Sequence, residues 1–183
     1  MMNRAHFAVT VISKDRPGIV ADTAEVLYRL GCNVEDSSCT MLGGDFAMIL
    51  TVSHAKPFTK ATLVDEFRRL HEDKGLVAHV RSLTEEDLNR PDPVGELCLI
   101  SVYGADRPGI VFRVTRELAQ RHVNITDLNT KLIGSETEPV YVMMLEAYLP
   151  GEMTVEEAEC LLAGLRAELN VEIGVRAITP VSL

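Results

Sequence analysis

The 183-residue sequence predicts an α+β protein of two similar domains, each an antiparallel sheet with helices on one face. The first observation is an internal repeat: residues 15–20, Asp-Arg-Pro-Gly-Ile-Val, recur unchanged 91 residues later at 106–111. The second is that strand-like and helix-like segments follow in the same order in both halves. A repeat at this spacing indicates a duplicated domain. The length of the chain alone would also allow one medium-sized domain.

Each half begins with a strand that leads into the repeated hexapeptide. Residues 6–12 and 97–103 are short, apolar and rich in β-branched residues, which predicts buried strands. Pro17 and Pro108 suit the first position of a following helix, and Gly31 suits its end in the first half. The expected buried faces of the two helices are Val20, Ala24, Leu27 and Leu30, and Val111, Val114, Leu118 and Ala119.

Two further strands follow in each half and form a hairpin. Residues 33–42 and 45–53 flank Gly43-Gly44, which permits the positive φ angles of a tight turn. The second half has about four additional residues in this turn, around 135–139.

A second helix and a last strand complete each half. Thr59 precedes the apolar residues of one helix, and Thr154-x-x-Glu157 forms a capping box before the other. Residues 76–82 and 171–179 are the last strands. The apolar residues expected on the two helices are Leu63, Phe67 and Leu70, and Ala158, Leu161, Leu162, Leu165 and Leu169.

The resulting βαββαβ order is the ferredoxin-like plan. We expect the first domain at residues 1–83, a charged linker at 84–95 and the second domain at 96–183. A domain of this size only just supports its own core, so we expect extra burial through pairing of the two domains or of chains.

Charge and hydropathy exclude several classes of protein. The net charge is −9, divided as −2 and −7 between the halves, which argues against direct contact with nucleic acid. No apolar run approaches the ~18 residues that span a bilayer, and no signal-peptide pattern is present, so we expect a cytoplasmic protein without membrane contact. The widely spaced cysteines, Cys32, Cys39, Cys98 and Cys160, are expected to be reduced and buried.

Catalytic and metal-binding motifs do not occur. The sequence contains no GxSxG elbow, Walker loop or HExxH pattern, and its five histidines share no ligand spacing. We therefore expect no enzyme activity, no cofactor and no metal.

The repeated turn has a chemistry of its own. The first turn of a helix offers unpaired N–H groups that hold anions, and Gly18 and Gly109 allow a ligand to approach the backbone. Asp15 and Asp106 suit an ammonium group, so the combination suits a free amino acid. The alternative is structural, because Asp-x-Pro-Gly also starts helices and glycine also permits close packing.

An asparagine and an arginine in each half also allow either a ligand-binding or a structural interpretation. Asn33 and Asn124 are ligand contacts or turn residues. Arg16 and Arg107 can reach a carboxylate, although an arginine in a turn is typically solvated.

The two hexapeptides, each between a strand and a helix and each followed by an Asn about 15 residues later, resemble the ACT domain family. The resemblance covers nearly the whole chain, and an arrangement of two such domains alone is similar to the glycine cleavage system transcriptional repressor family. It implies an amino-acid-sensing regulator whose domains pair side by side with ligand at their interface, and a homodimer. The net charge of −9 favours action through a regulatory protein partner. The implied ligand-binding residues are Asp15, Gly18, Ile19 and Asn33, and Asp106, Gly109, Ile110 and Asn124. The alternative is a ligand-free interaction module.

Overall fold

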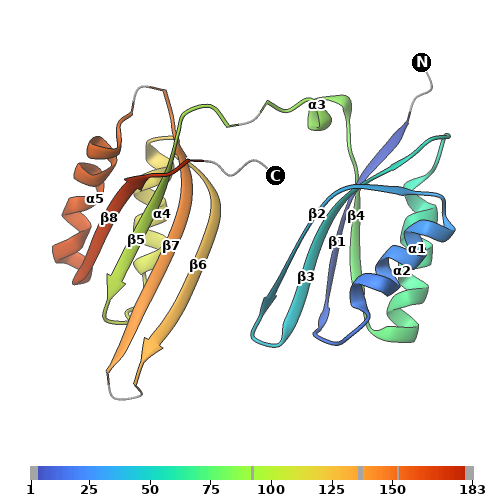
Figure 1. Ribbon diagram of the computed structural model, residues 1–183, viewed down its shortest axis with the longest axis horizontal. Helices are drawn as coiled ribbons and strands as arrows, with labels where there is room; N and C mark the ends of the chain where they lie inside the picture. The colour runs from blue at the N-terminus through green and yellow to red at the C-terminus, as the bar shows by residue number, and fades with distance from the viewer. Residues whose placement is uncertain (1–3, 92, 136–137, 152, 180–183) are drawn as a thin grey trace. The chain divides into compact units, whose positions relative to one another are not determined.

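Two compact units, residues 1–90 and 91–183, make up the chain. The computed structural model describes residues 4–91, 93–135, 138–151 and 153–179, and these contain eight strands and five helices. Each unit has the order βαββαβ and forms one four-stranded antiparallel sheet (Figure 1). The two ferredoxin-like domains predicted from the repeat are therefore confirmed.

The sheet of the first unit has β1 and β3 at its centre and β2 and β4 at its edges. Helices α1 and α2 lie on one face of it (Figure 1). The Gly43-Gly44 turn between β2 and β3 has the predicted positive φ angles, 61° and 83°. The elements are β1 Ala5–Lys14, α1 Ile19–Arg29, β2 Asn33–Leu42, β3 Asp45–His54, α2 Lys60–Lys74 and β4 Val77–Ser82.

Alternating residues of β1 and β3 form the core of this unit against the two helices. Leu63, Phe67 and Leu70 of α2 are buried as predicted. The strand residues that join them in the core are Phe7, Val9 and Val11, and Phe46, Met48, Leu50 and Val52.

The predicted buried face of α1 is partly wrong. Ile19, Thr23, Val26 and Leu27 are buried, whereas Val20 is 47% exposed and Ala24 is also exposed. The buried Ile19 sets the rotation of the helix. Its carbonyl accepts a 2.9 Å hydrogen bond from the Thr23 hydroxyl, so a threonine can occupy a core position.

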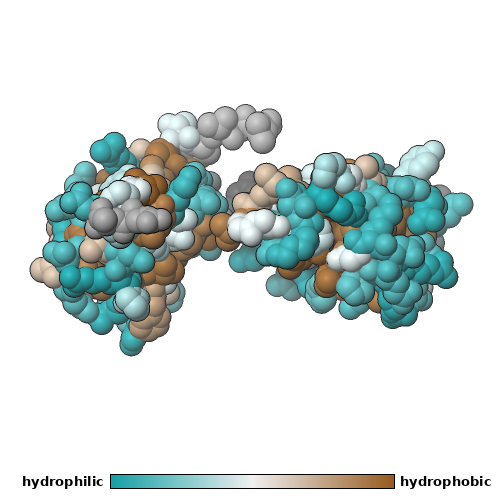
Figure 2. Space-filling view, turned by 90° about the horizontal axis from the view of Figure 1, so that it is seen from below, coloured by the Kyte–Doolittle hydropathy of each residue, from teal (hydrophilic) through white to brown (hydrophobic). Residues whose placement is uncertain are grey.

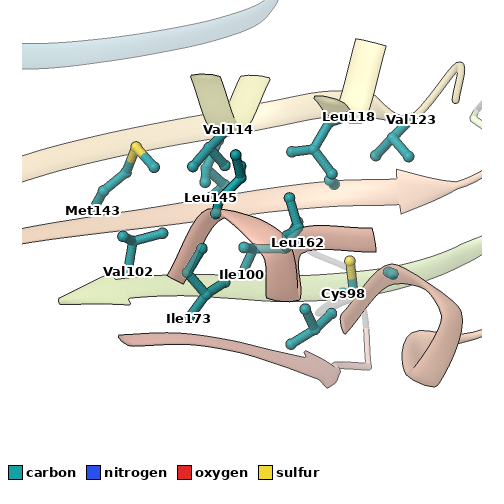
Figure 3. Close-up of a cluster of buried hydrophobic side chains, with 14 of the residues drawn as sticks. Cys98, Ile100, Val102, Val114, Leu118, Val123, Met143, Leu145, Leu162 and Ile173 are labelled. Atoms are coloured by element: carbon teal, nitrogen blue, oxygen red, sulfur yellow. The ribbon is translucent and has the colours of Figure 1, made fainter. Parts of the chain in front are cut away.

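The second unit repeats this arrangement, with strand order β6-β7-β5-β8. Its core combines side chains from both helices and three strands, including Ile100, Leu118, Leu145, Leu162 and Ile173 (Figure 3). The elements are β5 Glu96–Gly104, α4 Ile110–Gln120, β6 Asn124–Gly134, β7 Pro139–Leu149, α5 Val155–Leu169 and β8 Val171–Ala177.

The α4 face differs from the prediction in the same way as that of α1. Ile110, Val114 and Leu118 are buried, whereas Val111 and Ala119 are exposed. The isoleucine that follows the glycine is again the first residue inserted into the core.

Capping residues and backbone angles show where several of the helices begin and end. The predicted capping box of Thr154 and Glu157 is present at α5, while Thr59 occupies the N-cap of α2 without a side-chain cap. His122, which replaces the glycine that ends the first helix, has a positive φ of 58°. A four-residue helix that the sequence analysis missed, α3 Glu85–Leu88, lies in the segment interpreted as linker.

The expectation that all four cysteines are buried is wrong. Cys98 is buried, Cys32 is half-buried, and Cys39 and Cys160 are exposed. Cys39 belongs to β2, an edge strand whose ten residues are all exposed, and Cys160 lies on the outward side of α5. Spacing along the chain does not distinguish such positions from core positions.

Some large apolar side chains also remain at the surface of each unit, where they lie among polar ones (Figure 2). In the first unit they include Val20, Tyr28 and Met41, and in the second Phe112 and Leu132. No helix among the described residues is long and apolar enough to cross a membrane.

Candidate functional site

The first copy of the hexapeptide forms a tight turn between β1 and α1. The backbone N–H of Asp15 donates to the carbonyl of Gly44 at 3.0 Å, which ties the start of the turn to the β2–β3 hairpin. Gly18 is the N-cap of α1 with φ 93°, a left-handed conformation that favours glycine. Pro17, predicted at the first helical position, instead precedes this cap, because the helix begins at Ile19.

The second copy has the same geometry. Gly109 is the N-cap of α4 with φ 100°, and the helix begins at Ile110. Ile19 and Ile110 are 2% and 1% exposed, so their side chains anchor the turns in the two cores. Each can offer a ligand its backbone N–H, which lies in the first turn of a helix where no intrahelical partner exists.

The carboxylates at the two turns face solvent. Asp15 and Asp106 are exposed, and neither side chain forms an ion pair or hydrogen bond within the described part of the chain. Both are therefore available to an incoming ammonium group. The turn also contains the guanidinium of Arg16, the residue that follows Asp15, so side chains of opposite charge are neighbours in the chain.

Arg16 is not the solvated arginine that the sequence suggested. Its guanidinium donates to Asp22 at 2.7 Å and to the carbonyl of Pro17 at 3.2 Å. Lys74, at the end of α2, also contacts the Asp22 carboxylate. The pKa of Asp22 is held below its ordinary value, mainly by the hydrogen bond from Lys74 and also by the one from Arg16.

The second turn has no such arrangement. Arg113 occupies the position of Asp22 and pairs at 2.8 Å with Glu168 of α5. Arg107 is exposed, and no contact of its side chain occurs among the residues described. The two turns thus share a backbone geometry but differ in how their arginines are held.

A pocket of about 510 Å³ opens beside the first turn. Asp15, Arg16 and Gly18 form its polar end, next to the N-terminus of α1. Its apolar walls come from the exposed side of α1 and from the two strands of the hairpin. The remaining lining residues are Ile19, Val20, Ala21, Ala24, Met41 and Phe46.

The asparagines lie at the opposite end of each sheet. Asn33 pairs with Ser53 on β3, whereas the end of β1 that leads into the turn pairs with Asp45. Ser53 lies eight positions along β3 from Asp45, or about 27 Å at ~3.4 Å per residue. Asn124, paired with Tyr148, is likewise remote from the second turn. Within one unit the structure does not bring the predicted asparagine to the predicted turn.

Comparison with known families agrees with this architecture. An ACT-domain family model matches residues 5–81, and another ACT-domain model matches residues 99–146. The two matches together cover more than half of the chain, and each contains one turn. The protein belongs to the ACT domain family.

Individual relatives match either the whole chain or about one of its two ACT domains. The glycine cleavage system transcriptional repressor of Escherichia coli is 25% identical over 181 residues, which cover 97% of this chain and 93% of that protein. A UPF0237 protein of Methanopyrus kandleri is 40% identical over 76 residues, 41% of this chain and 82% of its own. The crystal structure of an unknown protein from Galdieria sulphuraria has a TM-score of 0.79 and 28% identity, covering 97% of this chain and 100% of that one.

The residues missed by sequence reasoning all belong to the first ACT domain. Asp22 holds Arg16, Lys74 pairs with Asp22, and Ala21 and Met41 line the pocket, but none of these four lies in the repeated hexapeptide. A signal was available in the differences between the two copies. The aligned positions carry alanine and phenylalanine at 21 and 112, and aspartate and arginine at 22 and 113.

Metal ligation has no candidate among the described residues of the two ACT domains. Within residues 4–91, 93–135, 138–151 and 153–179, no group of three or more His, Cys, Asp or Glu side chains is placed to hold a metal ion. The chemistry present at the turns is that of ion pairing and hydrogen bonding.

Proposed function

We propose that this protein is a cytoplasmic, non-catalytic regulator that senses a free amino acid and passes the signal on by contact with another protein. Its two ACT domains, and its similarity along 97% of its length to a protein named glycine cleavage system transcriptional repressor, support a role in regulating glycine cleavage genes. The observation that carries the sensing function is the convergence of an Asp15 carboxylate, an Arg16 guanidinium and helix N–H groups at one pocket.

An interface between ACT domains is the expected place for the ligand. Asn33 lies at one end of the edge strand β2, and the turn lies near the other end. If two such edges pair in antiparallel directions, the asparagine of one domain comes beside the turn of the other. This geometry favours a homodimer in which domains pair side by side and share the ligand.

The charge of the chain indicates how the signal is passed on. A net charge of −9 opposes the phosphate contacts that direct DNA binding needs. We therefore infer that transcription is affected through a regulatory protein partner and not through contact with an operator. Mobility-shift assays at low salt should detect no complex between the protein alone and DNA.

Calorimetry of the full chain against the twenty amino acids tests the sensing function. We expect binding by at least one amino acid at millimolar concentration, weakened by Asp15→Asn or Asp106→Asn at whichever turn is occupied. Glu72→Gln, on the exposed side of α2, is the control and should not change the affinity. If no amino acid gives heat, or if both turn variants bind like the wild type, the proposal is wrong.

A ligand-free assembly module is the second candidate, and the uncovered sheet face favours it. Ile12 and Val77 are neighbours in the pairing of β1 with β4, and they are 50% and 55% exposed. Ile49 on β3, also on this face, is 57% exposed. Sedimentation velocity distinguishes the two functions, because a pure assembly module keeps its oligomeric state and its protein partner whether or not amino acids are present.

A further inference from the structure

We propose that the pocket beside the first turn binds a free amino acid with an apolar side chain, and that the second turn offers no equivalent site. This inference rests on the proposed function and adds the class of ligand and the domain that binds it. Three features carry it: the charges at the polar end of the pocket, the small apolar residues of its wall, and the presence of Phe112 and Arg113 in the second ACT domain at the positions of Ala21 and Asp22.

The polar end matches the two charged groups of an amino acid. Asp15 lines the pocket with a carboxylate that has no partner among the described residues, and so can accept hydrogen bonds from an ammonium group. Arg16 lines the same pocket with a guanidinium that can bind a carboxylate.

Asp22 holds this guanidinium in place without neutralising the site. Its side chain is only 12% exposed, and it contacts both Arg16 and Lys74, so the three side chains keep one net positive charge. The two hydrogen bonds that Arg16 donates leave further N–H donors of its guanidinium for a ligand. The cation is therefore oriented before any ligand arrives, which lowers the entropy lost on binding.

The apolar end of the pocket matches a side chain larger than that of glycine. Ala21 and Ala24 are small, and Val20 and Met41 are 47% and 66% exposed at the pocket wall. Val20 and Ala24 belong to the face of α1 that the sequence pattern placed in the core and the structure leaves at the surface. A volume of about 510 Å³ also lies within the ~300–1,000 Å³ range of small-molecule sites.

The turn of the second ACT domain keeps its carboxylate and guanidinium as Asp106 and Arg107, but the small wall residue and the aspartate that holds the arginine are both replaced. Phe112 stands at the position of Ala21, is 58% exposed, and lies under the Arg116 guanidinium at 5.6 Å from its ring centroid. Arg113 stands at the position of Asp22 and pairs with Glu168, so no carboxylate at this position orients Arg107. An aromatic ring thus takes the place of the small wall residue, and the cation of the turn is not held.

Isothermal titration calorimetry of the full chain with glycine, valine, leucine and methionine tests the class of ligand. Removing the contact of an apolar side chain with the pocket should weaken binding about tenfold or more. We therefore expect leucine or methionine to bind at least about tenfold more tightly than glycine. We also expect one site per chain.

Ala21→Phe tests the pocket by giving the first helix the residue of the second. We expect the affinity for leucine to fall about tenfold or more, because the ring occupies the side-chain space. Phe112→Ala is the matched control and should leave leucine binding unchanged. Both positions are exposed, so thermal unfolding should confirm that each variant is folded. Arg16→Gln and Arg107→Gln form a second pair, of which only the first should weaken binding.

The outcomes separate this inference from the function on which it rests. If glycine binds as tightly as leucine, if two sites per chain are found, or if Ala21→Phe keeps full affinity, the inference is overturned while amino-acid sensing stands. If no amino acid binds the wild-type chain at all, the proposed function itself fails. Tight binding of one apolar amino acid that is lost in Ala21→Phe and kept in Phe112→Ala supports both.

Discussion

The guanidinium of Arg16 donates a 2.7 Å hydrogen bond to the carboxylate of Asp22, within the first turn of α1. Lys74 adds a contact from the end of α2, so one aspartate connects the turn to both helices of its domain. The second domain connects its helices with the charges reversed, through Arg113 and Glu168. Both domains therefore link their helices by an ion pair, but only the first also holds the arginine of the turn.

Asp22→Asn should destabilise the first domain in a pH-dependent way. The pKa of Asp22 lies below its ordinary value of 3.8 in the folded protein, so its ionised form stabilises the fold above that pH. This stabilisation disappears as the pH falls through the folded pKa. Urea unfolding should show a lower midpoint for the variant at pH 7 and a smaller difference from wild type at pH 3. Equal differences at both pH values would contradict this assignment, and Asp65→Asn on exposed α2 is the control.

Thr154→Ala should destabilise the second domain by about 1 kcal/mol, the usual contribution of an N-cap. The Thr154 hydroxyl accepts the N–H of Glu157 at 3.2 Å, and the Glu157 carboxylate accepts the N–H of Thr154 at 2.9 Å. Thr59 is the matched control, because it occupies the same position at α2 without a side-chain cap. Denaturant titration of both alanine variants measures the difference, and equal losses would show that the capping box contributes nothing.

Alanine substitutions at Gly109 and Gly164 should change the stability of the second domain in opposite directions. Gly109 has φ 100° and Gly164 lies inside α5, and a Cβ added at either meets no atom within 4 Å. Gly109→Ala should cost about 1 kcal/mol or more through backbone strain. Gly164→Ala should stabilise by about 0.5–1 kcal/mol, because alanine loses less entropy in a helix. Thermal unfolding reads both, and two changes of the same sign would refute the argument from φ.

Thiol labelling should divide the cysteines by their burial. Cys39 and Cys160 are exposed and should react with a disulfide reagent at pH 8 in the native state. Burial raises the pKa of Cys98 to about 11, so this thiol should react only after unfolding. Burial also raises the pKa of Cys32, which should react slowly. The mass of each labelled peptide identifies the site, and rapid labelling of Cys98 in the folded protein would contradict this order.

The number of domains, their element order and the two turns were predictable from the amino-acid sequence alone. These follow from local rules: a repeat means duplication, β-branched runs form strands, and a glycine that follows proline at the start of a helix can adopt positive φ. The Gly43-Gly44 hairpin and the Thr154–Glu157 capping box were predictable for the same reason. Each of these features depends on residues that are close together in the chain.

Long-range packing in the folded domain, by contrast, sets which face of α1 is buried and which residues lie beside the first turn. Val20 and Ala24 fit a helical period as well as Ile19 and Thr23 do, and only packing against the sheet chooses between them. Asp22 and Lys74 are 52 positions apart in the sequence, and they come into contact only because α1 and α2 pack side by side. Periodicity contains no information about such pairings, because their energy arises only when the sheet brings the two helices together.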